Sequence, residues 1–200
     1  ATDKGKILAF GDPERDQESR LEFANREVQV ASKSFAKKIT LTGENAKESV
    51  LKNLSKIDAE VLHFAVHGRF DKRDPLKSAL LLAKDANEDG DLETYEIYGL
   101  NINSNLVVLS ACESGIGKLA RGDEVQSLNR AFIYAGAGGV IASLWKVSDE
   151  STFKLMTYFY QELPKRGPAE ALRFAQIKLM KEFPSPYHWA AFYLTGRLDS

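Results

Sequence analysis

The chain has a single cysteine, Cys112, and only three histidines among its 200 residues. Because one cysteine cannot form an internal disulfide, the sequence predicts a reducing compartment, the cytoplasm, and a thiol that is free to react. No apolar run approaches the ~20 residues that a membrane span requires, and no secretory leader opens the chain. The net charge of -1 provides no basic footprint for nucleic acid. We therefore expect contact with neither membranes nor nucleic acid.

The sequence contains enough apolar residues to form the core of one domain. Apolar residues make up 44% of the sequence, and two tryptophans are among them. A chain of this size buries roughly 70% of its unfolded surface, so we expect a single domain over residues 1–200. The chain begins at Ala1 and not at Met. This start suggests a segment of a longer protein, although removal of an initiator methionine would give the same start.

Short apolar runs alternate with amphipathic helical segments along the chain. This order is typical of an α/β fold, with a mostly parallel central sheet of about six strands and helices on both faces. A hairpin insertion is expected near 79–94, outside the main sheet. The predicted strands are 6–10, 38–42, 60–66, 105–110, 140–145 and 189–195, and the predicted helices are 21–35, 46–54, 124–135, one after Ser148 and one opened by Pro168.

Two of these strands end in side chains that carry chemistry. The run 61–66 leads to His67 and Gly68, and the run 106–111 leads to Cys112. Reacting groups in open α/β sheets gather beyond the carboxyl ends of the strands, so adjacent strands would bring His67 and Cys112 together. A nearby imidazole can convert a thiol to the nucleophilic thiolate. The amides of Gly68 and Cys112 could then stabilise an oxyanion. This constellation predicts a cysteine peptidase.

Each of these residues also has an ordinary structural interpretation. A lone cysteine at a strand end is often a small buried hydrophobe. His63, four residues before His67 on the same strand, is expected to be core, and His188 is expected to anchor the last strand. The joint pattern favours catalysis, because a histidine about 45 residues before the cysteine resembles the caspase spacing.

Three further motifs invite a ligand interpretation. From Asp85, the positions of Asn87, Asp89, Gly90 and Glu96 match the spacing of a calcium-binding EF-hand loop. Flanking helices are missing from the pattern, so an ordinary solvated turn is favoured. The segment 115–120 matches a dinucleotide fingerprint but lacks the acidic residue ~20 positions later. The glycine cluster at 136–139 is expected to be a helix terminus and turn.

Ordered motifs along almost the whole chain resemble the CHAT domain, a family of caspase-like cysteine peptidases related to separase. The resemblance implies a caspase-like three-layer sandwich, a His67/Cys112 dyad, peptide-bond cleavage and no metal or organic cofactor. CHAT domains often follow tetratricopeptide repeats, which this chain lacks, so a regulatory sensor region or partner outside the chain is expected. The motifs that carry the resemblance are His67-Gly68, Leu109 to Gly115, Arg121 to Glu124, Arg130 to Ala137, Ser143 to Asp149 and Tyr187 to Phe192.

The resemblance also suggests where a substrate side chain would bind. Separase-like enzymes place an acidic residue of a Trp-x-Val-x-Asp segment in the pocket for the residue before the cut, and Asp149 follows Trp145 and Val147 in that pattern. Such a pocket would select arginine or lysine. Asp123 is a second candidate. Asp149 could equally interact with a helix dipole and Asp123 with a turn. The competing hypothesis for the whole chain is a catalytically silent interaction module with the same fold.

Overall fold

The computed structural model describes residues 5–16, 18–71, 73–110, 112–113 and 123–196. For residues 112–113 and 123–126 the description covers the backbone alone.

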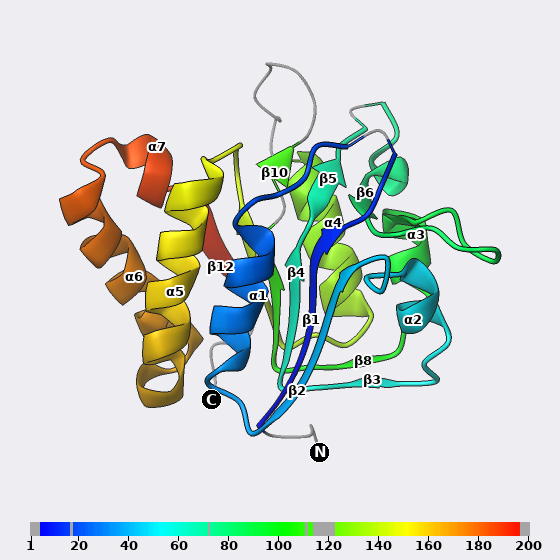
Figure 1. Ribbon diagram of the computed structural model, residues 1–200, viewed down its shortest axis with the longest axis horizontal. Helices are drawn as coiled ribbons and strands as arrows, with labels where there is room; N and C mark the ends of the chain where they lie inside the picture. Colours follow the sequence, from blue (N-terminus) through cyan, green and yellow to red (C-terminus); the bar gives the residue numbers. More distant parts are fainter. Residues whose placement is uncertain (1–4, 17, 72, 111, 114–122, 197–200) are drawn as a thin grey trace.

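A six-stranded sheet forms the centre of the molecule, with the strand order β12-β11-β9-β4-β1-β2 (Figure 1). Neighbouring strands are parallel except for β12, which runs antiparallel to β11. Every residue of β4 is buried, as an apolar run covered on both faces requires. The predicted α/β fold with a mostly parallel sheet of about six strands is confirmed. The strands are β1 (Lys6–Pro13), β2 (Lys37–Gly43), β4 (Val61–Ala65), β9 (Leu106–Leu109), β11 (Gly139–Ser143) and β12 (Phe192–Gly196).

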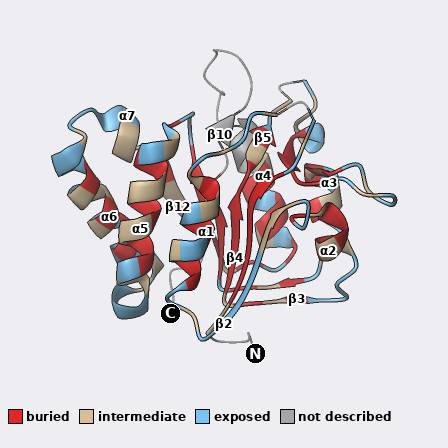
Figure 2. Ribbon diagram, viewed as in Figure 1, coloured by how far each residue is buried: buried red, intermediate tan, exposed pale blue. Residues whose placement is uncertain are grey.

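Helices cover both faces of this sheet and give three layers. One apolar cluster lies between the sheet and α1 (Ala24–Ser32), α5 (Asp149–Arg166) and α6 (Pro168–Glu182). The other lies beneath α2 (Glu48–Lys52), α3 (Thr94–Ile97) and α4 (Asp123–Tyr134). Figure 2 shows the buried sides of these helices turned toward the sheet. In the longer helices α1, α5 and α6, apolar residues at three- and four-residue spacing produce this one-sided burial.

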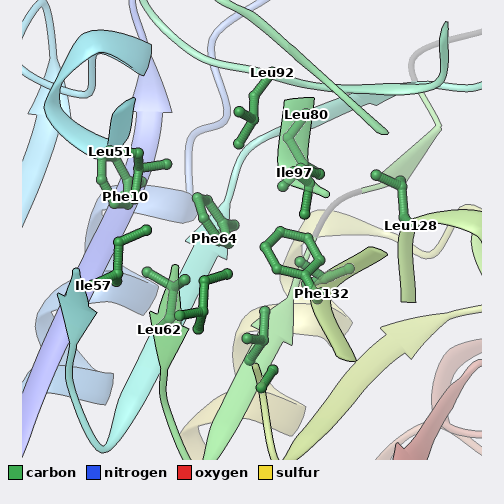
Figure 3. Packing of buried hydrophobic residues seen from close by; sticks show 14 of the residues in the cluster. Phe10, Leu51, Ile57, Leu62, Phe64, Leu80, Leu92, Ile97, Leu128 and Phe132 are labelled. Atoms are coloured by element: carbon green, nitrogen blue, oxygen red, sulfur yellow. The ribbon is translucent and has the colours of Figure 1, made fainter. Parts of the chain in front are cut away.

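Aromatic rings fill the second cluster. Phe64 of β4 stacks on Phe10 of β1, with ring centroids 5.3 Å apart, and contacts Phe132 of α4 at 5.8 Å. Figure 3 shows Phe64 between these two neighbours. The side chains of adjacent strands and of the covering helix therefore interlock at the middle of the sheet.

A second, four-stranded sheet with the order β10-β5-β6-β7 lies beyond the carboxyl end of β4 (Figure 1). Strands β6 (Ala79–Leu81) and β7 (Asp91–Glu93) are the predicted hairpin outside the main sheet. Strand β5 (His67–Arg69) continues the path of β4, and β10 (Cys112–Glu113) pairs with it. The smaller elements are β3 (Ile57–Asp58) paired with β8 (Ile102–Asn103), the 3-10 helix η1 (Pro75–Lys77) and α7 (Pro186–Trp189).

Several predicted elements differ at their ends. The predicted helix 46–54 spans only Glu48–Lys52, and the predicted strand 140–145 ends at Ser143. The predicted strand 60–66 ends at Ala65, and His67 belongs to the second sheet. The predicted helix 21–35 is shorter, spanning Ala24–Ser32. The predicted strand 189–195 begins only at Phe192, because Pro186 starts the short helix α7, a position where proline loses no hydrogen bond.

The glycine cluster after α4 is a helix terminus and turn, as predicted. Gly136 has a φ of 116°, and a Cβ at this position would lie 2.1 Å from the carbonyl oxygen of Ile102. Only glycine fits such a position. Among the described residues, no helix is long and apolar enough to cross a membrane.

Candidate active site

The second sheet aligns the two sequence-predicted catalytic residues. Cys112 of β10 is paired with His67 of β5, His67 with Leu81 of β6, and Leu81 with Asp91 of β7. These four residues form one row across the sheet. Paired strands lie about 4.7–4.9 Å apart, so the backbone of Cys112 is adjacent to that of His67. The Cys112 side chain lies outside the described residues.

The imidazole of His67 is held by a backbone carbonyl. Its Nε2 lies 2.8 Å from the carbonyl oxygen of Ser19, in the segment that connects β1 to α1. A carbonyl oxygen can only accept, so Nε2 carries the proton and donates it. In the neutral ring, Nδ1 is therefore the atom with a free electron pair.

The same connecting segment, the β1–α1 connection (residues 14–23, described except at 17), is anchored on Asp12. The Asp12 carboxylate is buried and accepts hydrogen bonds from Nε of Arg20 at 2.8 Å and from the amide of Leu21 at 2.9 Å. Asp12 also has a φ of 44°, which is uncommon for a residue other than glycine. These contacts fix the chain immediately after Ser19. Asp12 was not among the predicted site residues, and the only signal for it in the sequence is the run Gly11-Asp12-Pro13, with which β1 ends.

Asp149 lies in the first turn of α5, after the N-cap residue Ser148. Its carboxylate is half-buried and accepts a hydrogen bond from the amide of Phe23 at 3.0 Å. Burial raises the pKa of Asp149, the Phe23 bond lowers it, and the negative charges of Glu27 and Glu22 raise it further. The charge of His67 acts in the opposite sense on this pKa. Asp149 is thus a partly desolvated carboxyl group within electrostatic range of His67.

Other predicted site residues are placed only by their backbone. Gly68 is buried and is paired with Leu80 on one side and Glu113 on the other. Asp123 is the first residue of α4, and its side chain lies outside the described residues. The segment 115–120, with its dinucleotide-like spacing, also lies outside them.

The two remaining histidines have structural roles. His63 is fully buried, with Nδ1 2.9 Å from the hydroxyl of Tyr160 and Nε2 3.1 Å from Oε1 of Glu27. Its predicted place in the core is confirmed. His188 is in α7 and not in a strand, and its Nδ1 lies 3.1 Å from Oγ of Ser151. It fastens α7 to α5, just before the last strand.

The acidic turn between β6 and β7 uses its carboxylates within the protein. Asp85 accepts from the amides of Asn87 and Glu88. Glu96, the last position of the calcium-like spacing, binds Nζ of Lys52 at 2.8 Å and caps α3. The ammonium group of Lys52 also binds Glu48 and Glu88, so it occupies the centre of the only described cluster of three carboxylates. The arrangement matches a structural turn.

Comparison with known proteins places this geometry in context. A family model described as the CHAT domain matches residues 1–197. Tetratricopeptide repeat protein 28 of Mus musculus is 31% identical over 125 residues, covering 61% of this chain and 5% of the mouse protein. The chain thus spans about a twentieth of the length of this curated relative.

Solved structures resemble the fold over almost the whole chain. The Arg specific cysteine proteinase gingipain R superposes with a TM-score of 0.64 at 12% identity, covering 97% of this chain and 46% of that one. Protein GSU0716 from Geobacter sulfurreducens superposes with a TM-score of 0.53 at 13% identity, covering 96% of this chain and 94% of that one. At these identities the likeness establishes the fold, which is caspase-like.

Proposed function

We propose that this chain, which belongs to the CHAT domain family, is a cysteine endopeptidase that cleaves protein substrates with His67 and Cys112. The observation that carries the proposal is the register of the second sheet, in which Cys112 is paired with His67. The hydrogen bond from His67 to Ser19 supports it, because that bond leaves Nδ1 as the basic atom.

In the proposed reaction, Nδ1 of His67 takes the proton of the Cys112 thiol. The thiolate attacks the substrate carbonyl carbon and forms an S–C bond, and the carbonyl π electrons move to the oxygen. When the C–N bond breaks, the leaving amine takes the proton from His67. Water, deprotonated by His67, then attacks the thioester, which releases the carboxylic acid and the thiol. No step requires a metal or an organic cofactor.

The amides of Gly68 and Cys112 are the proposed donors to the oxyanion. Two backbone donors aimed at a developing negative charge stabilise the tetrahedral intermediate. Gly68 allows close approach because it has no Cβ. The pairing of Cys112 with His67 and of Glu113 with Gly68 places the backbones of Cys112 and Gly68 on adjacent strands of the second sheet.

Asp149 is the proposed acidic group of the pocket for the residue before the cut, with Asp123 as a second candidate. The half-buried Asp149 carboxylate, within electrostatic range of His67, would pair with an arginine or lysine side chain of the substrate. A preference for arginine is also stated for gingipain R, which shares the fold.

Regulation is proposed to come from outside this chain. The related mouse protein is named for tetratricopeptide repeats and is about twenty times longer than the matched part. An upstream sensor region or a partner would control access of protein substrates to the site. A reducing compartment, the cytoplasm, would keep Cys112 reactive.

The test is hydrolysis of fluorogenic peptides with Arg, Lys, Leu, Met or Asp before the cut, by the wild-type chain and by Cys112→Ala. We expect turnover in the wild type and its loss in the variant, because the nucleophile is removed. Labelling by an electrophilic peptide, located by mass spectrometry, should modify Cys112 in the wild type far faster than in His67→Ala. Equal and slow labelling in both proteins, without turnover, would indicate a silent interaction module instead.

A further inference from the structure

We propose that Asp91 is a positioning residue for His67, an inference that rests on the proposed peptidase function. The two carboxylate oxygens of Asp91 bind two different arginines. Oδ1 accepts from Nη2 of Arg15 at 2.6 Å, and Oδ2 accepts from Nη1 of Arg69.

These two arginines flank the two partners of one critical hydrogen bond. Arg15 lies four residues before Ser19 in the β1–α1 connection, and Arg69 lies two residues after His67 in β5. The carbonyl oxygen of Ser19 accepts the bond from Nε2 of His67. Both sides of that bond are therefore tied to the single carboxylate of Asp91.

Asp91 is itself rigidly placed. It is paired with Leu81, which is paired with His67, so it lies in the same row of the sheet as His67. Its amide donates to Oδ1 of Asp89 at 2.9 Å. The Asp91 side chain is only 16% exposed and that of Arg15 21%. The bond between Asp91 and Arg15 is therefore stronger than that of an exposed surface pair, whereas Arg69 is 46% exposed and its bond is more strongly screened by solvent.

Arg15 is bound to the hairpin at two further points. Its Nη1 donates to the carbonyl oxygens of Leu82 at 2.7 Å and Gly90 at 2.9 Å. The amide of Gly90 donates in turn to Oε2 of the buried Glu48 at 2.9 Å. The guanidinium group of Arg15 is thus held by backbone carbonyls of the hairpin. If the hairpin shifts, the β1–α1 connection should shift with it.

Replacing Asp91 by asparagine would weaken the connection between Arg15 and Arg69 without changing the size of the side chain. An asparagine provides one carbonyl oxygen and an NH₂ group that cannot accept a hydrogen bond, so one of the two arginines would lose its bond to residue 91. Arg15 would then keep only the carbonyl oxygens of Leu82 and Gly90, or Arg69 only the carboxylate of Glu93. The β1–α1 connection could then move relative to β5, and the Ser19 carbonyl would hold Nε2–H less firmly. Protonation at Nδ1 would become competitive, and the fraction of His67 with a basic Nδ1 would fall.

The experiment compares the wild type, Asp91→Asn, Asp91→Glu and the control Asp16→Asn. Asp16 lies in the same connection and pairs with Lys84 at 2.7 Å, with both side chains mostly exposed, so its variant makes the same charge change at a solvent-screened pair that does not involve Arg15 or Arg69. The first readout is ¹⁵N NMR of the His67 ring at a pH where the ring is neutral, which reports its tautomer. The second is the split between kcat and KM for the best peptide substrate.

We expect a dominant Nε2–H tautomer in the wild type and in Asp16→Asn, and a mixture of tautomers in Asp91→Asn. We expect kcat to fall about tenfold in Asp91→Asn with KM nearly unchanged, because a misplaced base slows the chemical step more than binding. Asp91→Glu, which keeps the carboxylate, should recover part of both signals.

A pure Nε2–H tautomer and an unchanged kcat in Asp91→Asn would overturn the proposal while leaving the peptidase function intact. If the wild type hydrolyses no peptide and its Cys112 is labelled no faster than in His67→Ala, the peptidase function fails, and the tautomer signal still decides whether Asp91 positions His67. If Asp91→Asn does not fold, Arg15→Met removes one of the two arginine partners of Asp91 and is judged by the same two readouts.

Discussion

At the scale of single residues, Asp149 is the proposed determinant of selectivity for a basic residue before the cut. Its carboxylate is held by the amide of Phe23 and surrounded by the charges of Glu22, Glu27 and His67. In Asp149→Asn, we expect kcat/KM for peptides with arginine or lysine before the cut to fall about 10- to 100-fold, the value of a charge-assisted hydrogen bond of about 1.5–3 kcal/mol. Peptides with leucine at that place serve as the control and should be cleaved as before.

The same residue predicts how selectivity changes with pH. Burial disfavours the charged carboxylate and raises the pKa of Asp149 above its ordinary value of 3.8. As the pH falls through this raised pKa, Asp149 becomes neutral and loses its attraction for a cation. The ratio of kcat/KM for arginine to leucine peptides should therefore fall on acidification, at a higher pH than an ordinary aspartate would give.

This ratio is the quantity to measure, because an effect of pH on the chemical step that both peptides share cancels from it. In Asp149→Asn the ratio should be low and independent of pH. A strong arginine preference in that variant, with the wild-type pH dependence, would assign the pocket to another group such as Asp123.

At the scale of elements, the turn between β6 and β7 depends on one glycine. Gly90 has a φ of 87°, and a Cβ there would lie 2.5 Å from the carbonyl oxygen of Leu82 and 2.9 Å from the amide of Lys84. We expect Gly90→Ala to lower the free energy of unfolding by about 2–3 kcal/mol, because backbone strain and steric overlap add. Urea denaturation followed by circular dichroism measures this loss.

The matched control is Gly43→Ala at the end of β2. Gly43 also has a positive φ, 57°, but nothing lies within 4 Å of its expected Cβ. Its loss should be only about 1 kcal/mol, from backbone strain alone. Equal losses in the two variants would mean that the contacts of Gly90 contribute nothing.

The same turn shows why local sequence patterns can mislead. The spacing from Asp85 to Glu96 resembles a calcium loop, yet the positive charge at its carboxylates comes from Lys52, on helix α2 and 36 residues before Glu88. A contact of this kind is tertiary, so no local window of sequence contains it. The strands of the main sheet were predictable because a strand buried on both faces is a continuous apolar run in the sequence. The division between β4 and β5 was not predictable, because it depends on the strands with which each of them pairs.

At the scale of the whole molecule, the strand order determines which residues meet at the candidate active site. That His67 and Cys112 follow neighbouring strands could be predicted, since the carboxyl ends of parallel strands meet at one edge of a sheet. The carbonyl of Ser19 could not be predicted, because a backbone oxygen has no residue signature. The proposed role of Asp91 could not be predicted either, since it depends on Arg15, 76 residues earlier in the chain.

The buried group of Glu27, His63 and Tyr160 joins α1, β4 and α5, and it gives a test of how the layers are held together. The pKa of Tyr160 is raised well above its ordinary value by burial, so its hydroxyl stays protonated. The hydroxyl lies 2.9 Å from Nδ1 of His63, and both side chains are almost completely buried. In Tyr160→Phe, Nδ1 of His63 loses its hydrogen-bond partner. Because the site is buried, no water molecule can take the place of the hydroxyl.

We expect Tyr160→Phe to lower the free energy of unfolding by about 1–3 kcal/mol, the cost of an unpaired buried polar group. The matched control is Tyr158→Phe, two residues earlier on α5, whose hydroxyl bonds to Glu182 near the surface. Its change should stay within about 0.5 kcal/mol, as for most surface substitutions. Equal changes in the two variants would contradict the prediction. A larger loss of unfolding free energy in Tyr160→Phe than in Tyr158→Phe, with both proteins unfolding in one cooperative transition, would show that the Tyr160–His63 contact links the sheet to its helical layer.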